Sequence, residues 1–395
     1  MTVRRRWSLF VSLLVLGQLP LAWAGATTRA HTSSPPKLRI VDGHKVGLGA
    51  VLSTSDGGQI FGWDVDQHGA DGVLAASQDV KKGYEVSVQT FDQTSGAITS
   101  TFARSTGQRN SYGVDGIFAG DVALVTHYVV PPGSIYAKRR YELMDRVTTQ
   151  RFTGPWTSPI KDFDVLQSGD NQSTATSLLY GIELHHQSAP ALVVTDLAAD
   201  TSSVITLDPN VYGDGTTVLA QDVSKNRAVL ASSNGTVGGD PPLNSIVNLA
   251  TGHITTWNGL NIGPYGAGFV NGIAVDSSTG IAATTTELNA EVEFYDLAAR
   301  DGFAVQLPGT GDADQLNSGT EVAVDTMHHL FLVADPVYRP TGGSAIVVYD
   351  EQGNLVEGIT GFRFSFTPGH IAVNPKTRTG WADGPGIDQL QQFFY

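Results

Sequence analysis

Short apolar runs that end at a polar turn residue recur along the second half of the chain. The stretch Asn271-Gly-Ile-Ala-Val-Asp276 is followed by strand-like runs at 281–287, 291–297 and 302–307. The same order returns at 321–325, 330–335, 345–350 and 355–360, and again at 370–374, 380–383 and 389–395. Polar and apolar residues alternate in several of these runs, as they do in half-buried strands. Four short strands per unit, repeated along the chain, predict a β-propeller.

The spacing of the turn residues that close the first strands sets the number of units. These residues are Asp66, Asp121, Asp170, Asp222, Asp276, Asp325 and Asn374. The gaps between them are 55, 49, 52, 54, 49 and 49 residues, close to the length of about 40–50 residues that one blade requires. We therefore expect an all-β, seven-bladed β-propeller with four-stranded antiparallel blades. Six blades is the alternative, because residues 162–170 lack a clear strand pattern.

The last unit contains only three strand-like runs, so its fourth strand must come from elsewhere. The run Lys37-Leu-Arg-Ile-Val41 is the first apolar segment near the amino terminus. We predict that it pairs with 389–395 and closes the ring. A ring closed by an N-terminal strand leaves no long open sheet edge, which protects a β-protein from aggregation.

The first residues have the features of a secretory signal peptide. Arg4, Arg5 and Arg6 precede an apolar segment at 7–16, and Ala22-Trp23-Ala24 is a small-x-small cleavage site. The alternative, an uncleaved anchor, requires an apolar segment of about 20 residues. We expect a signal peptide over 1–24, a flexible leader over 25–36, and one propeller domain over 37–395. The mature protein would then be secreted or periplasmic.

Composition narrows the choice of partners. Charged residues make up 16% of the chain, there are 45 glycines, and there is no cysteine, so no disulfide is expected. Removing residues 1–24 removes three arginines and no acid, and the mature net charge becomes 21 − 38 = −17. Such an acidic surface repels nucleic acid and anionic lipid. We expect a monomer without a membrane span after cleavage of the signal peptide.

One end of the predicted ring collects polar side chains. In an antiparallel meander, the starts of first strands and the ends of second strands lie at the same end, around the mouth of the central channel. The residues at these positions are Asp115, Asn271, Glu287, Glu321, Asp335, His370 and Asp383. Oxygen-rich clusters suit Ca²⁺ or another divalent metal, and a crowded carboxylate can serve as a general base. The candidate catalytic residues are Glu321, His370 and Asp335. The alternative is that Asp and Asn only close turns.

Three longer loops are expected at the same end. The first loop, 130–138, contains Tyr136 and is followed by Arg139. The second, 232–244, is rich in Gly and Pro, and the third, 335–344, contains Tyr338 and Arg339. Loops on a rigid scaffold are common binding sites, and Tyr and Arg are frequent at interfaces. We predict that these four residues bind the ligand, and their cations would suit a carboxylated one. The alternative is that the cations pair with nearby acids.

Other motifs carry less chemistry. The pair His328-His329 lies in a predicted turn at the end opposite the mouth and lacks metal-ligand spacing. No Gly-x-Ser-x-Gly, phosphate loop or dinucleotide fingerprint is present. We expect Trp63, Trp257 and Trp381 to pack between blades rather than to bind sugars.

The carboxyl-terminal units resemble known propellers. Residues 320–350, with Val322-Ala-Val-Asp325 and Leu330-Phe-Leu-Val-Ala-Asp335, are similar to an NHL-type repeat. Asn271-Gly272 and Asp115-Gly116 resemble the strand starts of the gluconolactonase/regucalcin propellers, and the resemblance is clearest over 265–395. In that family an Asn, an Asp and a Glu hold a divalent metal that polarises a lactone carbonyl. The resemblance implies Asn271 and Asp115 as ligands, while the first strand, Gln59-Ile-Phe-Gly-Trp-Asp-Val65, lacks the family's glutamate.

Two functions are compatible with these features. The first is an exported binding scaffold that recognises a protein, peptide or glycan through the loop-bearing face and channel mouth. The second is a divalent-metal-dependent hydrolase of the lactonase type that acts at the central channel. A structural protein of the cell envelope is a third possibility. The sequence alone leaves open whether the protein is an enzyme.

Overall fold

The computed structural model describes most of the chain beyond residue 37. The described ranges are 38–67, 69–80, 83–107, 110–118, 122–129, 138–145, 156–157, 163–168, 178–185, 190–196, 201–208, 212, 217–232, 243–260, 270–286, 291–308, 321–336, 340, 343–364 and 370–395. Only the backbone is described between 102 and 189 and at 78–80, 83–86, 193, 195–196, 201–202 and 223. The predicted signal peptide and leader lie outside these ranges. None of the helical segments within them has the length and hydropathy that a membrane span requires.

The described residues form seven antiparallel sheets, six of which follow the chain as four-stranded meanders. The first three contain β3 (Gln59–Val65), β4 (Asp71–Val80), β5 (Gly83–Asp92) and β6 (Ile98–Gly107); β7 (Asn110–Phe118), β8 (Val122–Val129), β9 (Lys138–Asp145) and β10 (Trp156–Thr157); and β11 (Phe163–Ser168), β12 (Leu178–His185), β13 (Ala191–Asp196) and β14 (Thr201–Thr206).

The fourth to seventh sheets complete the set. The fourth contains β15 (Thr217–Asp222), the 3-10 turn η1 (Val223–Lys225), β16 (Arg227–Ser232), β17 (Leu243–Asn248) and β18 (Ile254–Asn258). The fifth contains β19 (Val270–Asp276), β20 (Ile281–Thr286), β21 (Glu291–Asp296) and β22 (Asp301–Gln306), and the sixth β23 (Glu321–Asp325), β24 (Leu330–Asp335), β25 (Ser344–Asp350) and β26 (Leu355–Phe362). The seventh joins β27 (Ile371–Asn374), β28 (Thr379–Asp383) and β29 (Gln389–Phe394) to β2 (His44–Ser53) and β1 (Arg39–Val41).

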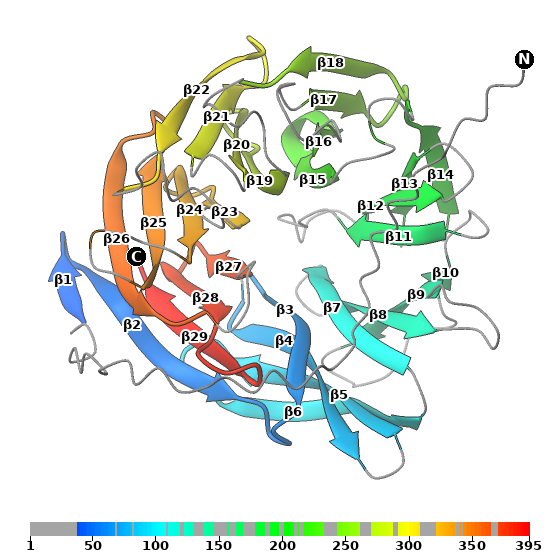
Figure 1. Ribbon diagram of the computed structural model, residues 1–395, viewed down its shortest axis with the longest axis vertical. Helices are drawn as coiled ribbons and strands as arrows, with labels where there is room; N and C mark the ends of the chain where they lie inside the picture. Colours follow the sequence, from blue (N-terminus) through cyan, green and yellow to red (C-terminus); the bar gives the residue numbers. More distant parts are fainter. Residues whose placement is uncertain are drawn as a thin grey trace, which may run out of the picture. The chain divides into compact units, whose positions relative to one another are not determined.

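The sheets follow one another around a closed ring with their first strands innermost (Figure 1). Neighbouring sheets make contact through β3 and β7, β9 and β11, β11 and β15, β15 and β19, β19 and β23, β23 and β27, and finally β27 and β3. The predicted all-β fold of four-stranded antiparallel units is therefore confirmed. The predicted strands of the last three units agree with the observed ones to within about two residues.

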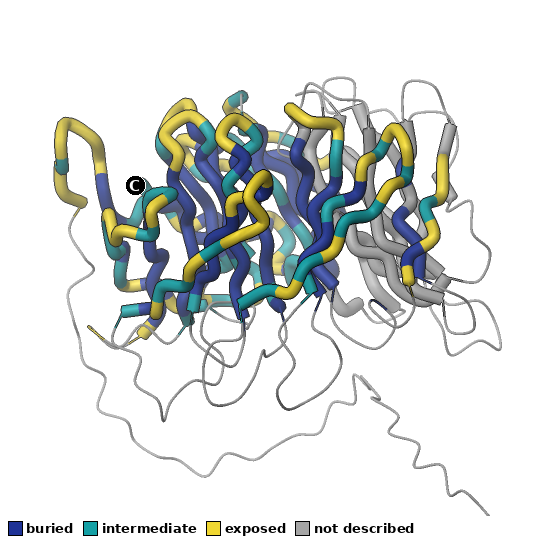
Figure 2. The backbone as a smooth tube through the Cα atoms, turned by 90° about the horizontal axis from the view of Figure 1, so that it is seen from above, coloured by how far each residue is buried: buried dark blue, intermediate teal, exposed yellow. Residues whose placement is uncertain are grey.

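The core lies between neighbouring sheets because alternate residues of a strand face opposite neighbours. In β23, Val322 and Val324 pack against the fifth sheet, whereas Ala323 packs against the seventh. Phe294 of the fifth sheet meets Phe331 of the sixth with ring centroids 5.5 Å apart. Figure 2 shows that buried residues dominate the strands, while exposed residues gather at the turns and on the outermost strands. Each sheet thus depends on two neighbours for its burial.

The ring is closed by an N-terminal strand, but not by the one that the sequence suggested. Strand β2 pairs with β29, with Leu52 opposite Leu390, and β1 pairs only with β2 on the outside. The prediction that Lys37–Val41 pairs with 389–395 is therefore wrong. Asp42 and Gly43 adopt left-handed backbone angles, φ 47° and 82°, and turn the chain back in a tight hairpin. Leu52 is 1% exposed and Ile40 66% exposed, which shows which strand supplies buried surface.

The two ends of the ring differ in the length of their connections. In the fourth to seventh sheets, one end, which we call the turn end, has short turns between strands: 223–226, 249–253, 277–280, 297–300, 326–329, 351–354 and 375–378. At the other end of these four sheets, which we call the loop end, most stretches between strands are longer: 233–242, 259–269, 307–320, 336–343 and 363–370, with 287–290 and 384–388 the short exceptions. The loop end is the end of the predicted channel mouth.

Candidate functional site

Three of the predicted mouth residues meet at the loop end. His370 precedes β27, Glu321 begins β23, and Asp383 ends β28, so the sixth and seventh sheets bring them together. The Nδ1 atom of His370 lies 2.7 and 2.8 Å from the two carboxylate oxygens of Glu321. The backbone N–H of His370 donates to Oδ2 of Asp383 over 2.9 Å. We call Glu321, His370 and Asp383 the mouth cluster.

The first sheet completes the mouth cluster through Trp63. Its indole Nε1–H donates to Oδ1 of Asp383 over 2.9 Å, and its ring meets the ring of His370 edge to face, with centroids 4.5 Å apart. Trp63 is also buried, as predicted, in a core cluster that includes Trp381. The sequence predicted packing for Trp63, but not its link to the mouth, because the two contacts join residues more than 300 positions apart.

The charges of the mouth cluster fix the protonation state of His370. Desolvation alone would lower the pKa of His370, but the negative charge of Glu321, its hydrogen bond to the ring, and the charges of Asp383 and Asp64 together raise that pKa to about 10. The imidazole is nevertheless 41% exposed. At neutral pH His370 is therefore a cation paired with Glu321, and it has no free lone pair with which to act as a general base.

The carboxylates of the mouth cluster are occupied by protein donors. Both oxygens of Asp383 accept hydrogen bonds, and both oxygens of Glu321 face His370. Within the described ranges, no group of three metal-ligating side chains forms at the mouth. This arrangement holds the sixth, seventh and first sheets together, and it favours the turn-and-packing interpretation for Glu321 and Asp383.

The structure describes only some of the other predicted site residues. Asp335 is fully buried at the end of β24, and Asn271 is half-buried near the start of β19. The next residue, Gly272, lies so close to the sixth sheet that an added Cβ would stand 2.9 Å from Cα of Glu321. Glu287, Tyr136, Tyr338 and Arg339 lie outside the described residues, and Asp115 and Arg139 lie where the backbone alone is described. The divalent-metal site at the mouth stays a prediction.

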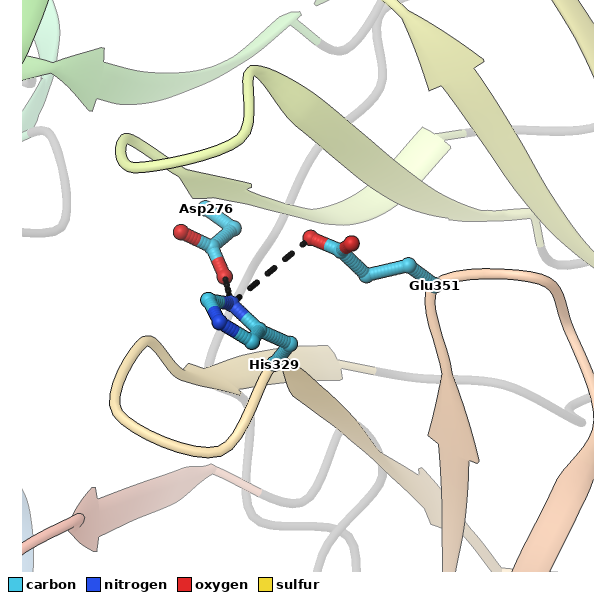
Figure 3. Close-up of side chains that lie close together, drawn as sticks. All are labelled: Asp276, His329 and Glu351. Carbon is cyan, nitrogen blue, oxygen red and sulfur yellow. Dashed lines mark hydrogen bonds and ion pairs between the residues drawn. The ribbon is translucent and has the colours of Figure 1, made fainter.

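A second cluster lies at the turn end and was not predicted. Nδ1 of His329 is 2.8 Å from Oδ2 of Asp276 and 4.0 Å from Oε1 of Glu351 (Figure 3). Asp276 ends β19, His329 closes the turn before β24, and Glu351 opens the turn after β25. We call these three residues the turn cluster. No ligand role was predicted from the sequence for the pair His328-His329. The cluster could have been found from the repeat, because Asp276 and His329 lie in equivalent turns of consecutive repeats, which become neighbours in the ring.

The surroundings of His329 in the turn cluster favour an ion pair over a metal site. The hydrogen bond that the His329 ring donates to Asp276 raises the pKa of His329 despite desolvation, and the charges of Asp276, Glu351 and Asp325 raise it further. A metal would require the neutral imidazole with its Nδ1 lone pair free. The three groups are close enough to hold a divalent cation, but a raised pKa and a bonded Nδ1 both favour the imidazolium.

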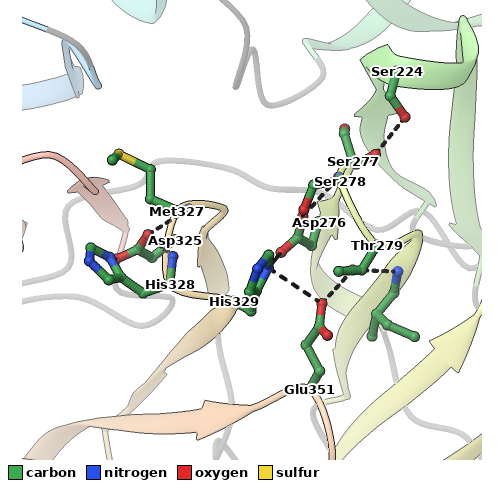
Figure 4. A network of polar contacts seen from close by, with 11 residues as sticks. Ser224, Asp276, Ser277, Ser278, Thr279, Asp325, Met327, His328, His329 and Glu351 are labelled. Atoms are coloured by element: carbon green, nitrogen blue, oxygen red, sulfur yellow. Dashed lines mark hydrogen bonds and ion pairs between the residues drawn. The ribbon is translucent and has the colours of Figure 1, made fainter.

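The same geometry recurs in neighbouring turns (Figure 4). Oδ1 of Asp276 accepts the N–H of Ser278 over 2.9 Å, and Oδ1 of Asp325 accepts the N–H of Met327 and of His328, each over 3.0 Å. The second oxygen then faces a neighbour: Oδ2 of Asp325 accepts the hydroxyl of Tyr395 over 3.0 Å. Because buried polar groups must be paired, these repeated contacts are structural links between sheets.

Comparison with known proteins bears on the fold alone. The sequence matches no protein-family model and no curated protein. Among solved structures it is similar to the WD40 repeats of RRP9, with 11% identity and TM-score 0.59 over 89% of this chain and 99% of that one. The Cps50 (Swd1) β-propeller domain of Myceliophteria thermophila shares 10% identity over 89% and 99%, with TM-score 0.53.

An enzyme shares the fold as well. Hydrazine synthase of Kuenenia stuttgartiensis has 11% identity and TM-score 0.57, over 88% of this chain and 98% of that one. Identities this low carry no information on ligand or chemistry. Together with the ring of antiparallel sheets, the similarities show that the chain folds as a β-propeller, and they support this fold in general rather than the NHL-type group in particular.

Proposed function

We propose that the protein is an exported binding scaffold that recognises a protein, peptide or glycan through its loop end. The observation that carries this proposal is the difference between the two ends of the ring. In the fourth to seventh sheets, connections at the turn end are short, whereas 259–269, 307–320 and 336–343 are long at the loop end. Long loops in a compact domain are usually functional, and a rigid scaffold positions them.

Residues that suit recognition are predicted at the same end, and they support the proposal. Tyr338 and Arg339 lie within 336–343, Tyr136 lies between β8 and β9, and Arg139 is the second residue of β9. His370 adds a cation that is 41% exposed, and its Nε2–H has no partner among the described residues. These donors and aromatic rings support a ligand with carboxylate, carbonyl or hydroxyl acceptors.

The ligand can be sought with defined probes. We would screen the mature protein against an immobilised glycan array and a displayed peptide library. Replacing 336–343 with a Gly/Ser segment of equal length should weaken binding of the ligand at least about tenfold, since each lost anchor is typically worth 1–2 kcal/mol. The matched control replaces 351–354 at the turn end and should leave binding unchanged. Binding that survives the first replacement and fails with the second would contradict the proposal.

Export is part of the proposal and rests on the signal-peptide features of residues 1–24. The test is to express the full chain in its native cell type and to sequence the amino terminus of the processed protein. We expect a mature chain that begins at Gly25 outside the cytoplasmic membrane. A full-length chain that stays in the cytoplasm would contradict export, while leaving the binding proposal intact.

The lactonase alternative rests on the resemblance of Asn271-Gly272 and Asp115-Gly116 to metal-binding strand starts. The protonated His370 and its pairing with Glu321 favour the binding scaffold, because two of the three candidate catalytic residues are committed to each other. The assay is lactone hydrolysis with Ca²⁺, Mn²⁺ or Zn²⁺ by the wild type and by Asn271→Ala. Metal-dependent turnover that the variant loses would favour the hydrolase.

A further inference from the structure

A basic cavity lies at the turn end between the fourth and fifth sheets. Its volume is about 340 Å³, and its lining includes Lys225, Arg227, His253 and Arg300. Ile246 and Leu297 contribute apolar surface to the same cavity. No acidic side chain is among the described residues that line it. This composition contrasts with the protein as a whole, whose formal net charge is −14.

The cavity is built by three turns that the propeller brings together. Lys225 ends η1 and Arg227 begins β16, His253 precedes β18, and Arg300 closes the turn between β21 and β22. Arg300 adopts a left-handed φ of 58°, as do Asn226, Gly280, His329 and Arg378, which close four of the other short turns. Two of these turns belong to the fourth sheet and one to the fifth, so the cavity exists only where the two sheets are neighbours.

The cations of the cavity are only partly neutralised. Nε of Arg227 bonds Oδ2 of the buried Asp222 over 2.6 Å, but Nη2 of the same guanidinium is buried without a hydrogen-bond partner. Lys225 and Arg300 form no direct ion pair within the described part of the chain. The charge of Lys225 helps to lower the pKa of Asp296, after the hydrogen bonds from the backbone of Ala299 and Ala298, but Asp296 lies outside the lining. Because Nη2 is buried, it does not open into the cavity, so the positive charge that faces the cavity comes from Lys225, Arg300 and the rest of the Arg227 guanidinium.

We propose that this cavity binds a small organic phosphate or sulfate ester. The tetrahedral oxyanion would accept hydrogen bonds from the side chains of Lys225 and Arg300, beside the charge of Arg227, because ammonium and guanidinium groups are the donors that bind such oxyanions most strongly. The organic part would rest on Ile246 and Leu297. The cavity is larger than a bare oxyanion and lies within the usual size range of small-molecule sites, which favours an ester over inorganic phosphate.

The proposal can be tested with two probes by isothermal titration calorimetry. Phenyl phosphate and phenyl sulfate share the ring and differ in the charge of the oxyanion, and benzyl alcohol is the neutral control. We expect one saturable site for at least one ester at low ionic strength, weakened by added NaCl because part of the attraction is screened. Phosphate preference over sulfate would identify the class of ester. Absence of saturable binding by both esters, or equal binding of benzyl alcohol, would overturn the proposal.

Variants distinguish ester binding in the cavity from attraction of the ester to surface charge in general. Lys225→Met and Arg300→Gln should each weaken ester binding about tenfold, because each removes a charge-assisted hydrogen bond. Lys376→Met is the matched control: Lys376 occupies the corresponding turn of the seventh sheet and does not line the cavity. Arg227 is left intact because it neutralises buried Asp222. All three changed residues are at the surface, so equal melting temperatures are expected. If Lys376→Met weakened binding as much as the other two, the proposal would be wrong.

Discussion

Two histidine–carboxylate pairs lie at opposite ends of the propeller and have different surroundings. At the turn end, His329 pairs with Asp276, whose carboxylate is fully buried and also caps its own turn. At the loop end, His370 pairs with Glu321, whose carboxylate is 28% exposed. The carboxylate of the first pair has structural counterparts in other turns, such as Asp325 and Asn374. The pair at the mouth has no equivalent among the described sheets.

The difference teaches how to separate structural from functional polar residues in a repeat protein. A polar residue that recurs at the same position of each repeat, with the same hydrogen bonds, meets a need of the repeated backbone. A polar cluster that occurs once cannot be explained by the repeat. By this criterion the turn-end carboxylates stabilise the ring, whereas the exposed ring of His370 at the mouth and the basic cavity are where function should be sought.

The largest expected effect comes from breaking a turn-end link. Asp325 is fully buried and accepts from two backbone N–H groups, from His328 and from the hydroxyl of Tyr395. Asp325→Ala should lower the free energy of unfolding by about 3 kcal/mol, because several buried donors lose their acceptor. Asp296→Ala is the control, since this exposed residue caps a similar turn alone, and about 1 kcal/mol is expected. Urea unfolding measures both; equal losses would contradict the comparison.

The second prediction concerns Glu293, a buried acid in the half of β21 nearer the loop end, and the pH dependence of stability that its burial causes. Desolvation raises the pKa of Glu293 to about 7 from 4.5, although a hydrogen bond from Tyr295 lowers it. The folded state therefore binds this proton more tightly than the unfolded state, and stability declines as the pH rises from 4.5 to 7. Glu293→Gln should stabilise the protein by about 3 kcal/mol at pH 8 and by little at pH 4. An unchanged stability at pH 8 would show that Glu293 ionises normally.

The ion pair of the turn cluster should contribute less. His329 is 48% exposed, so solvent screens its attraction to Asp276. His329→Gln should lower stability by less than about 1 kcal/mol. Because the pKa of His329 is raised in the folded state, its contribution is complete below its unfolded pKa and disappears as the pH rises through the raised value. Denaturation at pH 6 and pH 9 should show the larger difference at pH 6, and the reverse order would contradict this interpretation.

The last prediction concerns the mouth. Because Glu321 raises the pKa of His370 in the folded state, Glu321→Gln should lower the melting temperature near pH 6 more than above pH 10, and solvent reduces the loss because both side chains are partly exposed. The same change should lower the pKa of His370 from about 10 toward the ordinary value, since Glu321 is the main group that raises it. NMR titration of the His370 ring measures that pKa. A ring that titrates near 6.5 in the wild type would show that the mouth pair does not form in solution.

The strands of the last three units could be predicted because their signals are local. Short continuous apolar runs that end at an Asp fix 321–325 and 330–335 without reference to other parts of the chain. The closing strand could not be predicted, since both 37–41 and 44–53 carry apolar residues near the amino terminus. The choice between them depends on the Asp42-Gly43 hairpin and on which strand reaches β29.

The mouth cluster could be predicted in part and the cavity not at all. Strand order and direction place Glu321, His370 and Asp383 at one end, because equivalent positions of a repeat meet around an axis. Trp63 and the basic cavity depend on distances between sheets, which no period in the sequence reports. The same holds for Gly272, which is required by the approach of the backbone of the sixth sheet.

By itself, the sequence determined the repeat, the strands within it and the end at which each polar residue lies. Only the tertiary structure decided which partner each residue meets, and His328 and His329 show why. His328 bonds Asp325 of its own repeat, whereas His329 bonds Asp276 of the preceding one. Consecutive side chains point in different directions, and the neighbour on each side of a sheet is a whole repeat away in the chain. Strand signals come from local hydrophobic periodicity, but these pairs form only when the ring packs.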